Sequence, residues 1–152
     1  MTVVAADRLS ATELAAWRGM LEAHARVTRA LDAQMRTGHG LPVSSYEVLM
    51  FLADAPDHRL RMSEIADRVL LSRSGLTRLV DRLEQLGFVS RCGVETDGRG
   101  AYAQLTDAGL DEARAARRTH LAGVRQFFLD HLTDDDQQAI AAVWARLGRS
   151  QP

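Results

Sequence analysis

The sequence predicts a mainly α-helical protein with one small β-hairpin, and three observations favour this class. Apolar residues recur at spacings of three and four along most of the chain, which is the period of amphipathic helices. Hydroxyl side chains that can cap a helix precede the periodic segments at Ser10, Ser44 and Thr106. Residues 88–105 instead place two short apolar segments around a charged, Gly-rich stretch, which is typical of a hairpin.

The most informative segment is the helix expected directly after Ser72. Its apolar positions share one face: Leu76, Leu79, Val80, Leu83 and Leu86. The other face begins with short polar residues and arginines: Ser72, Arg73, Ser74, Gly75, Thr77 and Arg78. Such a face fits a DNA major groove, because small residues allow close approach while hydroxyl and guanidinium groups meet phosphates and base edges. Ser72 is the expected N-cap, and the free N–H groups of the first turn favour a phosphate there.

The hairpin decides between two interpretations of this helix. An amphipathic core helix with a solvated arginine face would give the same pattern in isolation. The hairpin, however, follows directly, with strands expected over 88–94 and 101–105. The first strand has apolar residues at positions 88, 92 and 94, although Val89 breaks strict alternation. Another helix is expected at residues 62–69, before the helix that follows Ser72. Two such helices followed by a hairpin form a winged helix.

Several motifs in this region resemble those of the MarR family of bacterial transcription regulators. They are MSEIADRVLLSRSGLTRLVDRLEQLGFVSR from Met62, the D-G-R triplet at 97–99 and LTDAG at 105–109. The resemblance covers nearly all of residues 10–148. One departure is that Arg61 lies three residues before Glu64, where the family often has a Thr or Ser cap.

The resemblance implies a single domain over residues 1–152 that binds DNA as a homodimer. In this arrangement residues 10–37 and 106–148 form dimerisation helices, and residues 44–105 form the winged-helix part. The implied function is sequence-specific transcription regulation, with repression relieved by a small molecule as the favoured mode.

The resemblance also assigns roles to the hairpin tip. Arg99 would enter the minor groove and Asp97 would orient an arginine or the turn, whereas a solvated charge pair is the alternative.

Arg82 is a further candidate DNA contact, unless it only pairs with nearby acids. Asp81 is expected to be a structural partner, because phosphates repel a carboxylate.

The segments before the winged helix predict two helices. A capping box at Ser10 and Glu13 opens a long helix to about residue 37, with the seam Leu14, Trp17, Leu21, His24, Thr28, Leu31 and Met35. A small domain cannot bury so long a seam, so a partner helix is expected. A second capping box at Ser44 and Glu47 opens a central apolar helix to Ala53, followed by a loop over 54–59 and a minimal strand at residues 60–61.

Two helices are expected after the hairpin. One runs from a Thr106 cap to about His131, with the apolar stripe Leu110, Ala113, Leu121, Val124, Phe127 and Phe128. The last begins after Thr133 and stops at Gly148, and it is expected to bury Ile140, Val143, Trp144 and Leu147. Apolar seams beyond the needs of one core favour a homodimer, and a two-fold pair reads a palindromic operator.

Charge and composition limit the class of protein. The net charge is −1, but residues 59–99 carry +2, so the positive charge falls on the expected DNA-binding part. No apolar run approaches the roughly 20 residues of a membrane helix, and the N-terminus has no secretory pattern. The single cysteine excludes an internal disulfide, which favours a cytoplasmic protein.

Other chemistries have weaker signals. The chain shows no nucleophile motif, acid–base pair or phosphate loop, so neither an enzyme nor a cofactor is expected, and the five histidines lack metal-ligand spacing. Cys92 suggests a thiol redox sensor, although a buried, inert cysteine is favoured. The resemblance implies a small aromatic or anionic effector, for which the candidate pocket residues are Trp17, His24, Tyr46 and Met50.

Two rival functions stay open. A winged-helix module that binds a protein instead of DNA would favour apolar residues at positions 73, 74, 77 and 78, and none is present. A ligand-binding or enzymatic protein on the same scaffold would be supported by turnover of an aromatic acid.

Overall fold

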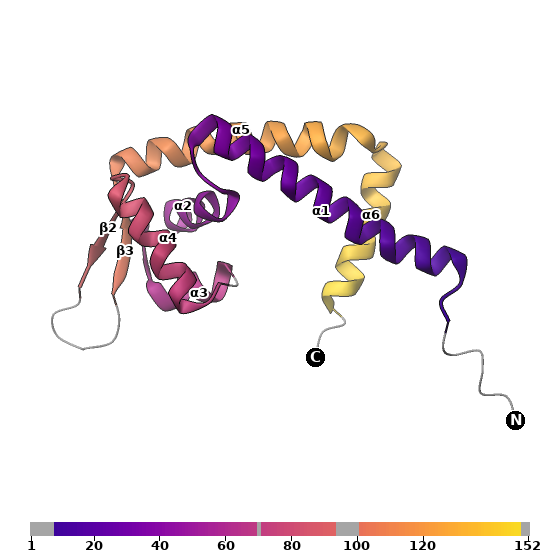
Figure 1. Ribbon diagram of the computed structural model, residues 1–152, viewed down its shortest axis with the longest axis horizontal. Helices are drawn as coiled ribbons and strands as arrows, with labels where there is room; N and C mark the ends of the chain where they lie inside the picture. Colours follow the sequence, from indigo (N-terminus) through magenta and orange to yellow (C-terminus); the bar gives the residue numbers. More distant parts are fainter. Residues whose placement is uncertain (1–7, 70, 94–100, 150–152) are drawn as a thin grey trace, which may run out of the picture. The chain divides into compact units, whose positions relative to one another are not determined.

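The computed structural model describes residues 8–69, 71–93 and 101–149. The described chain forms two compact units: a first unit up to Leu31 and from Gly123 onward, and a second unit from Asp32 to Ala122. The elements are α1 Ala11–His39, α2 Val43–Asp54, η1 Pro56–His58, β1 Arg59–Arg61, α3 Met62–Val69, α4 Arg73–Gln85, β2 Val89–Cys92, β3 Tyr102–Leu105, α5 Asp107–Phe127, η2 Leu129–His131 and α6 Asp134–Arg149 (Figure 1). The expected fold class, helices with a small hairpin sheet, is confirmed.

The sheet has three antiparallel strands in the order β1-β3-β2. The minimal strand predicted at residues 60–61 is therefore real, and Leu60 pairs with Ala103. On β2 the buried residue is Val89, which pairs with Leu105, another buried residue. Of the expected apolar positions, Phe88 is partly buried and packs against the core, Cys92 lies on the face opposite Val89, and position 94 lies outside the described residues.

The core of the second unit lies between α2, α3, α4 and the sheet. Fully buried apolar side chains come from each helix, with Leu49 on α2, Ile65 on α3 and Leu83 on α4. The apolar face predicted for α4 is confirmed for all members but one. Leu86 is 47% exposed, because it lies just beyond the helix as its C-cap residue.

Three of the predicted caps form as expected. Ser10 and Glu13 make a reciprocal capping box, in which the Glu13 N–H donates to Ser10 Oγ and the Ser10 N–H donates to Glu13 Oε2. Thr106 Oγ1 accepts the Gly109 N–H at 3.0 Å. Thr133 caps α6, where its Oγ1 accepts the N–H of Asp136. Hydroxyl caps thus fix most helix starts from local sequence alone.

The capping box predicted at Ser44 does not form. Helix α2 begins one residue earlier, at Val43, and its N-cap Pro42 has no side-chain hydrogen bond. Asp32, near the end of α1, replaces the cap because its Oδ1 accepts the Val43 N–H at 2.9 Å. The Arg36 side chain, together with this N–H, lowers the pKa of the Asp32 carboxyl.

The helices after the sheet differ from the prediction in two respects. Helix α5 ends at Phe127 and not near His131, because Phe128 has φ −134° and ψ −64° and a short 3-10 turn follows. Side chains that were expected to be buried are exposed: Leu121, Val143, Trp144 and Leu147. Ile140 is half-buried. No helix in the described ranges is long and apolar enough to cross a membrane.

Candidate nucleic-acid interface

The interface is built on the N-terminal end of α4. Ser72 is extended (φ −63°, ψ 156°), and its Oγ accepts the Gly75 N–H at 3.1 Å, so the predicted N-cap is confirmed. A methyl group at Gly75 would come within 3.2 Å of that Oγ, which explains why a glycine suits the position. The cap leaves other N–H groups of the first turn available to an anion.

The outer face of α4 presents the polar residues that the sequence predicts. Ser72, Arg73, Ser74, Thr77 and Arg78 are all exposed, and Gly75 is partly buried among them. The Thr77 hydroxyl donates to the Arg73 carbonyl at 2.9 Å, which fixes that side chain against the helix. The opposite face is anchored in the core, so these groups are displayed on a rigid element.

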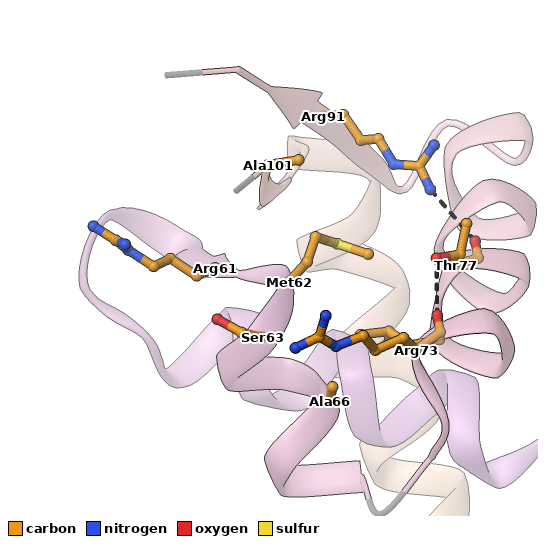
Figure 2. Close-up of a pocket in the computed structure, with 9 residues that line it drawn as sticks. Arg61, Met62, Ser63, Ala66, Arg73, Thr77, Arg91 and Ala101 are labelled. Atoms are coloured by element: carbon orange, nitrogen blue, oxygen red, sulfur yellow. Dashed lines mark hydrogen bonds between the residues drawn. The ribbon is translucent and has the colours of Figure 1, made fainter. Parts of the chain in front are cut away.

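A groove of about 550 Å³ lies beside this face, between α3, α4 and the sheet. Its rim carries three arginines from three elements: Arg61 from β1, Arg73 from α4 and Arg91 from β2. Figure 2 shows Arg73 extending toward Ser63 and Arg91 directed toward Thr77. Arg91 pairs with carboxylates of α4, so the positive charge of this concave surface comes from Arg61 and Arg73, which attract an anionic backbone.

Arg91 joins the hairpin to α4, and sequence reasoning missed it. Its guanidinium lies 2.6 Å from Asp81 Oδ1 and 3.7 Å from Glu84 Oε2, and it also donates to the Thr77 carbonyl at 3.4 Å. The Arg91 N–H donates to Glu84 Oε1 as well. The structural role predicted for Asp81 is confirmed. The available signal was the spacing of two residues between Val89 and Arg91, because positions two apart share one face of a strand.

The structure does not test the DNA contacts predicted for Arg82, Asp97 and Arg99. Arg82 is exposed, and its Nη2 donates to the Gly40 carbonyl at 3.3 Å; among the described residues, no ion pair between Arg82 and a nearby acid forms. Asp97 and Arg99, at the hairpin tip, lie outside the described residues. The DNA contacts assigned to these three residues stay predictions.

Comparisons with known proteins now identify the family. The model described as MarR family matches residues 39–100. The HTH-type transcriptional repressor YetL of Bacillus subtilis is 31% identical over 113 residues, which cover 72% of this chain and 68% of YetL. This chain belongs to the MarR family.

Two solved structures extend the family likeness to nearly the whole chain. Sco3205 of Streptomyces coelicolor, a MarR family transcriptional regulator solved in complex with DNA, is 36% identical with a TM-score of 0.85, and the match covers 95% of both chains. AbsC, another MarR family regulator of that organism, is 33% identical with a TM-score of 0.82, covering 95% of this chain and 99% of AbsC. These relatives are described as transcriptional regulators and not as enzymes.

The candidate effector residues of this MarR-family chain lie in different units. Tyr46 is buried in the second unit, where Met50 packs beside it and His120 stacks on its ring at 4.8 Å. Burial raises the pKa of Tyr46 and lowers the pKa of His120. Trp17 and His24 are exposed residues of the first unit. Their shared role in a pocket stays a prediction.

Cys92 and the histidines complete the predicted sites. Cys92 is partly exposed and not buried as expected, because it follows Val89 at an odd spacing and so lies on the outer face of the sheet. Its Sγ donates to Gln104 Oε1 at 3.4 Å. Among the described residues, no group of three or more His, Cys, Asp or Glu side chains could bind a metal ion.

Proposed function

We propose that this MarR-family transcription regulator is a cytoplasmic homodimer that represses transcription by binding a palindromic operator in double-stranded DNA. The observation that carries the proposal is the exposed, capped N-terminal end of α4, where Arg73 and Thr77 line the positive groove and Arg78 is exposed on the same helix. Exposed hydroxyl and guanidinium groups on a rigid helix suit readout of a major groove. Similarity to Sco3205, solved with DNA, supports this assignment.

The homodimer is supported by exposed apolar side chains in the first unit. Trp17 and Leu21 of α1 are 54% and 47% exposed, and Trp144 and Leu147 of α6 are 46% and 55% exposed. Clusters of large exposed apolar residues mark interaction surfaces, and a second copy of the chain would cover them. A dimer also places two winged helices on one duplex, which raises specificity for a palindrome.

The proposal includes an effector. A small aromatic or anionic molecule would bind better to one spacing of the two recognition helices, and so release the DNA. Trp17, His24, Tyr46 and Met50 are the proposed pocket residues. The name of YetL, a transcriptional repressor, supports repression as the mode.

Binding of the full-length protein to DNA upstream of its own gene tests the proposal. Fluorescence anisotropy should show tight binding at a palindrome, with affinity that falls steeply as salt rises. Arg78→Ala and Arg99→Ala should each weaken binding by about tenfold, the usual range for a lost DNA contact. Arg114→Ala is the matched control, because Arg114 is an exposed arginine on α5 outside the interface. Wild-type binding to no duplex would contradict the proposal and favour a protein partner.

A further inference from the structure

The outer face of the sheet carries a cluster that the polar face of α4 does not include. Two arginines of β1 lie against one tyrosine of β3, and we name this cluster, Arg59, Arg61 and Tyr102, the arginine–tyrosine platform. The guanidinium carbon of Arg59 is 4.9 Å from the centre of the Tyr102 ring, and that of Arg61 is 5.3 Å away. Arg61 Nε also donates to the Tyr102 hydroxyl at 2.8 Å.

Strand geometry places these side chains together. Arg61 pairs with Tyr102, and Arg59 pairs with Gln104, so both arginines share the face opposite the buried Leu60. The ring attracts both cations and limits their motion. Within the described residues, the hydrogen bond to the Tyr102 hydroxyl uses Arg61 Nε and leaves the terminal N–H groups of that guanidinium for other acceptors. In the described part of the chain, neither guanidinium is paired with a carboxylate. Glu64, the acid nearest to Arg61 in sequence, accepts the Arg61 backbone N–H instead.

The platform adjoins the candidate DNA interface. Arg61 lines the same groove as Arg73 and Thr77 of α4, and it immediately precedes α3. Figure 2 shows its side chain directed away from Thr77 and Arg91, on the far side of Met62. The guanidinium therefore extends the positive surface outward, past the edge of the groove.

We propose that the arginine–tyrosine platform binds backbone phosphates of the DNA duplex, with Arg61 and Arg59 as the phosphate ligands and Tyr102 as a positioning residue. This inference rests on the proposed DNA-binding function and adds a contact surface outside α4 and the hairpin tip. A guanidinium offers parallel N–H donors that match phosphate oxygens. Stacking on a ring fixes those donors before binding, which lowers the entropy lost on contact. Contacts of this kind fix register on the duplex and carry no base specificity.

The test measures how binding depends on salt. The full-length protein is titrated into two duplexes of about 30 base pairs, one from upstream of its own gene and one of mixed sequence, long enough for two half-sites. Arg61→Ala and Arg59→Ala should each weaken binding to both duplexes by about fivefold and reduce the salt slope by about 2, because the proposed homodimer loses one phosphate contact in each of its two copies. The control Arg114→Ala removes the same charge from α5 and should leave the slope unchanged.

Two conservative variants separate positioning from general structure. Tyr102→Phe keeps the ring and loses only the hydroxyl that accepts from Arg61, so affinity should fall about threefold with the salt slope unchanged. Arg61→Lys keeps the charge and should restore the slope of Arg61→Ala without the full affinity. Circular dichroism checks the fold of each variant, and Arg61→Gln replaces Arg61→Ala if that protein is unfolded.

Each outcome decides the inference. If wild type binds DNA and the Arg59 and Arg61 variants have the same salt slope as wild type, the platform does not bind phosphates. The proposed function would then stay intact. An equal loss in Arg114→Ala would also overturn it, since the effect would then be one of net charge. Wild-type binding to neither duplex would refute the proposed function, and this inference with it.

Discussion

The two compact units differ in where their large apolar side chains lie. In the second unit Leu49, Ile65 and Leu83 are fully buried between helices and the sheet. In the first unit Trp17, Trp144 and Leu147 are about half exposed, with fractions of 54%, 46% and 55%. Both regions form regular helices, so the difference lies in packing and not in secondary structure.

In both units, capping side chains close in sequence determine where helices begin. Ser10 and Thr133 cap helices in the first unit, as Ser72 and Thr106 do in the second. Caps depend on residues within one turn, whereas burial depends on elements that are distant in sequence. The comparison teaches that local caps fix helix ends in both units, while large apolar side chains of the first unit stay exposed, as expected for the proposed homodimer.

The largest expected effect is on a close contact in the second unit. Gly109 is buried in the first turn of α5, where an added methyl group would collide with the Phe88 carbonyl oxygen and approach Leu105. Gly109→Ala should lower the free energy of unfolding by about 3 kcal/mol, the upper range for overpacking. Urea denaturation followed by circular dichroism measures this change.

A glycine of the first unit gives the matched control. A methyl group at Gly19, inside α1, would meet nothing within 4 Å. Gly19→Ala should raise the free energy of unfolding by about 0.8 kcal/mol, through the better helix propensity of alanine. Equal destabilisation by both substitutions would show that the first unit is packed as tightly as the second.

The next effect concerns association. Trp144→Ala should raise the dimer dissociation constant by about 30-fold, the cost of losing an aromatic interface residue. Analytical ultracentrifugation measures this constant. Both tryptophans lie in the first unit, so a concentration-dependent shift of tryptophan emission offers a second measurement.

Two exposed leucines make a matched pair for the same experiment. Leu147→Ala should weaken the dimer, whereas Leu86→Ala should not, although these side chains are 55% and 47% exposed in their respective units. A monomeric wild-type protein, or equal effects of the two leucines, would refute the inferred partner surface.

How much the sequence predicts follows from the same comparison. Ser72 as a cap and Leu76, Val80 and Leu83 as a buried face were predicted correctly, because both depend on spacing within one helix. Ser44 was wrongly chosen as a cap, since the competing acceptor, Asp32, comes from a different helix. Caps and buried faces within one helix can be predicted from the sequence, whereas contacts between different helices or strands cannot.

The candidate site divides in the same way. The exposed face of α4 was predicted from its polar spacing, and the structure displays it as expected. The ion pair of Arg91 with Asp81 and the contact of Arg61 with Tyr102 were missed. Packing of β2 against α4 brings the first pair together, and the register of β1 on β3 brings the second pair together. The burial expected for Val143 was wrong, since an amphipathic pattern does not say whether its apolar face meets the same chain or another copy.

Loss of a cap should separate stability from DNA binding. Ser72→Ala and Ser10→Ala each remove one capping hydroxyl, so both should lower the free energy of unfolding by about 1 kcal/mol. Only Ser72→Ala should also weaken DNA binding, because Ser72 starts the exposed end of α4. Thermal unfolding and fluorescence anisotropy on the same samples test this prediction, and equal loss of DNA affinity in Ser10→Ala would contradict it.

The smallest effect is a difference in pH dependence between the units. Burial against Tyr46 lowers the pKa of His120 below its ordinary value of 6.5. The unfolded chain therefore takes up a proton before the folded one, and stability falls as the pH drops from about 6.5 through the folded pKa. In the first unit a capping hydrogen bond from Ser10 lowers the pKa of Glu13 below 4.5, so its stabilisation persists above that pH and is lost only as the pH falls further, through the folded pKa.

His120→Phe isolates the contribution of the second unit, because phenylalanine keeps a ring against Tyr46 but cannot bind a proton. Urea midpoints measured between about pH 7 and pH 5 should fall for wild type and fall less for the variant. The Glu13→Gln protein should follow wild type over this interval, since Glu13 is ionised in both states there. A variant as pH-sensitive as wild type would contradict this prediction, because His120 would then take up its proton at the same pH in the folded and unfolded states.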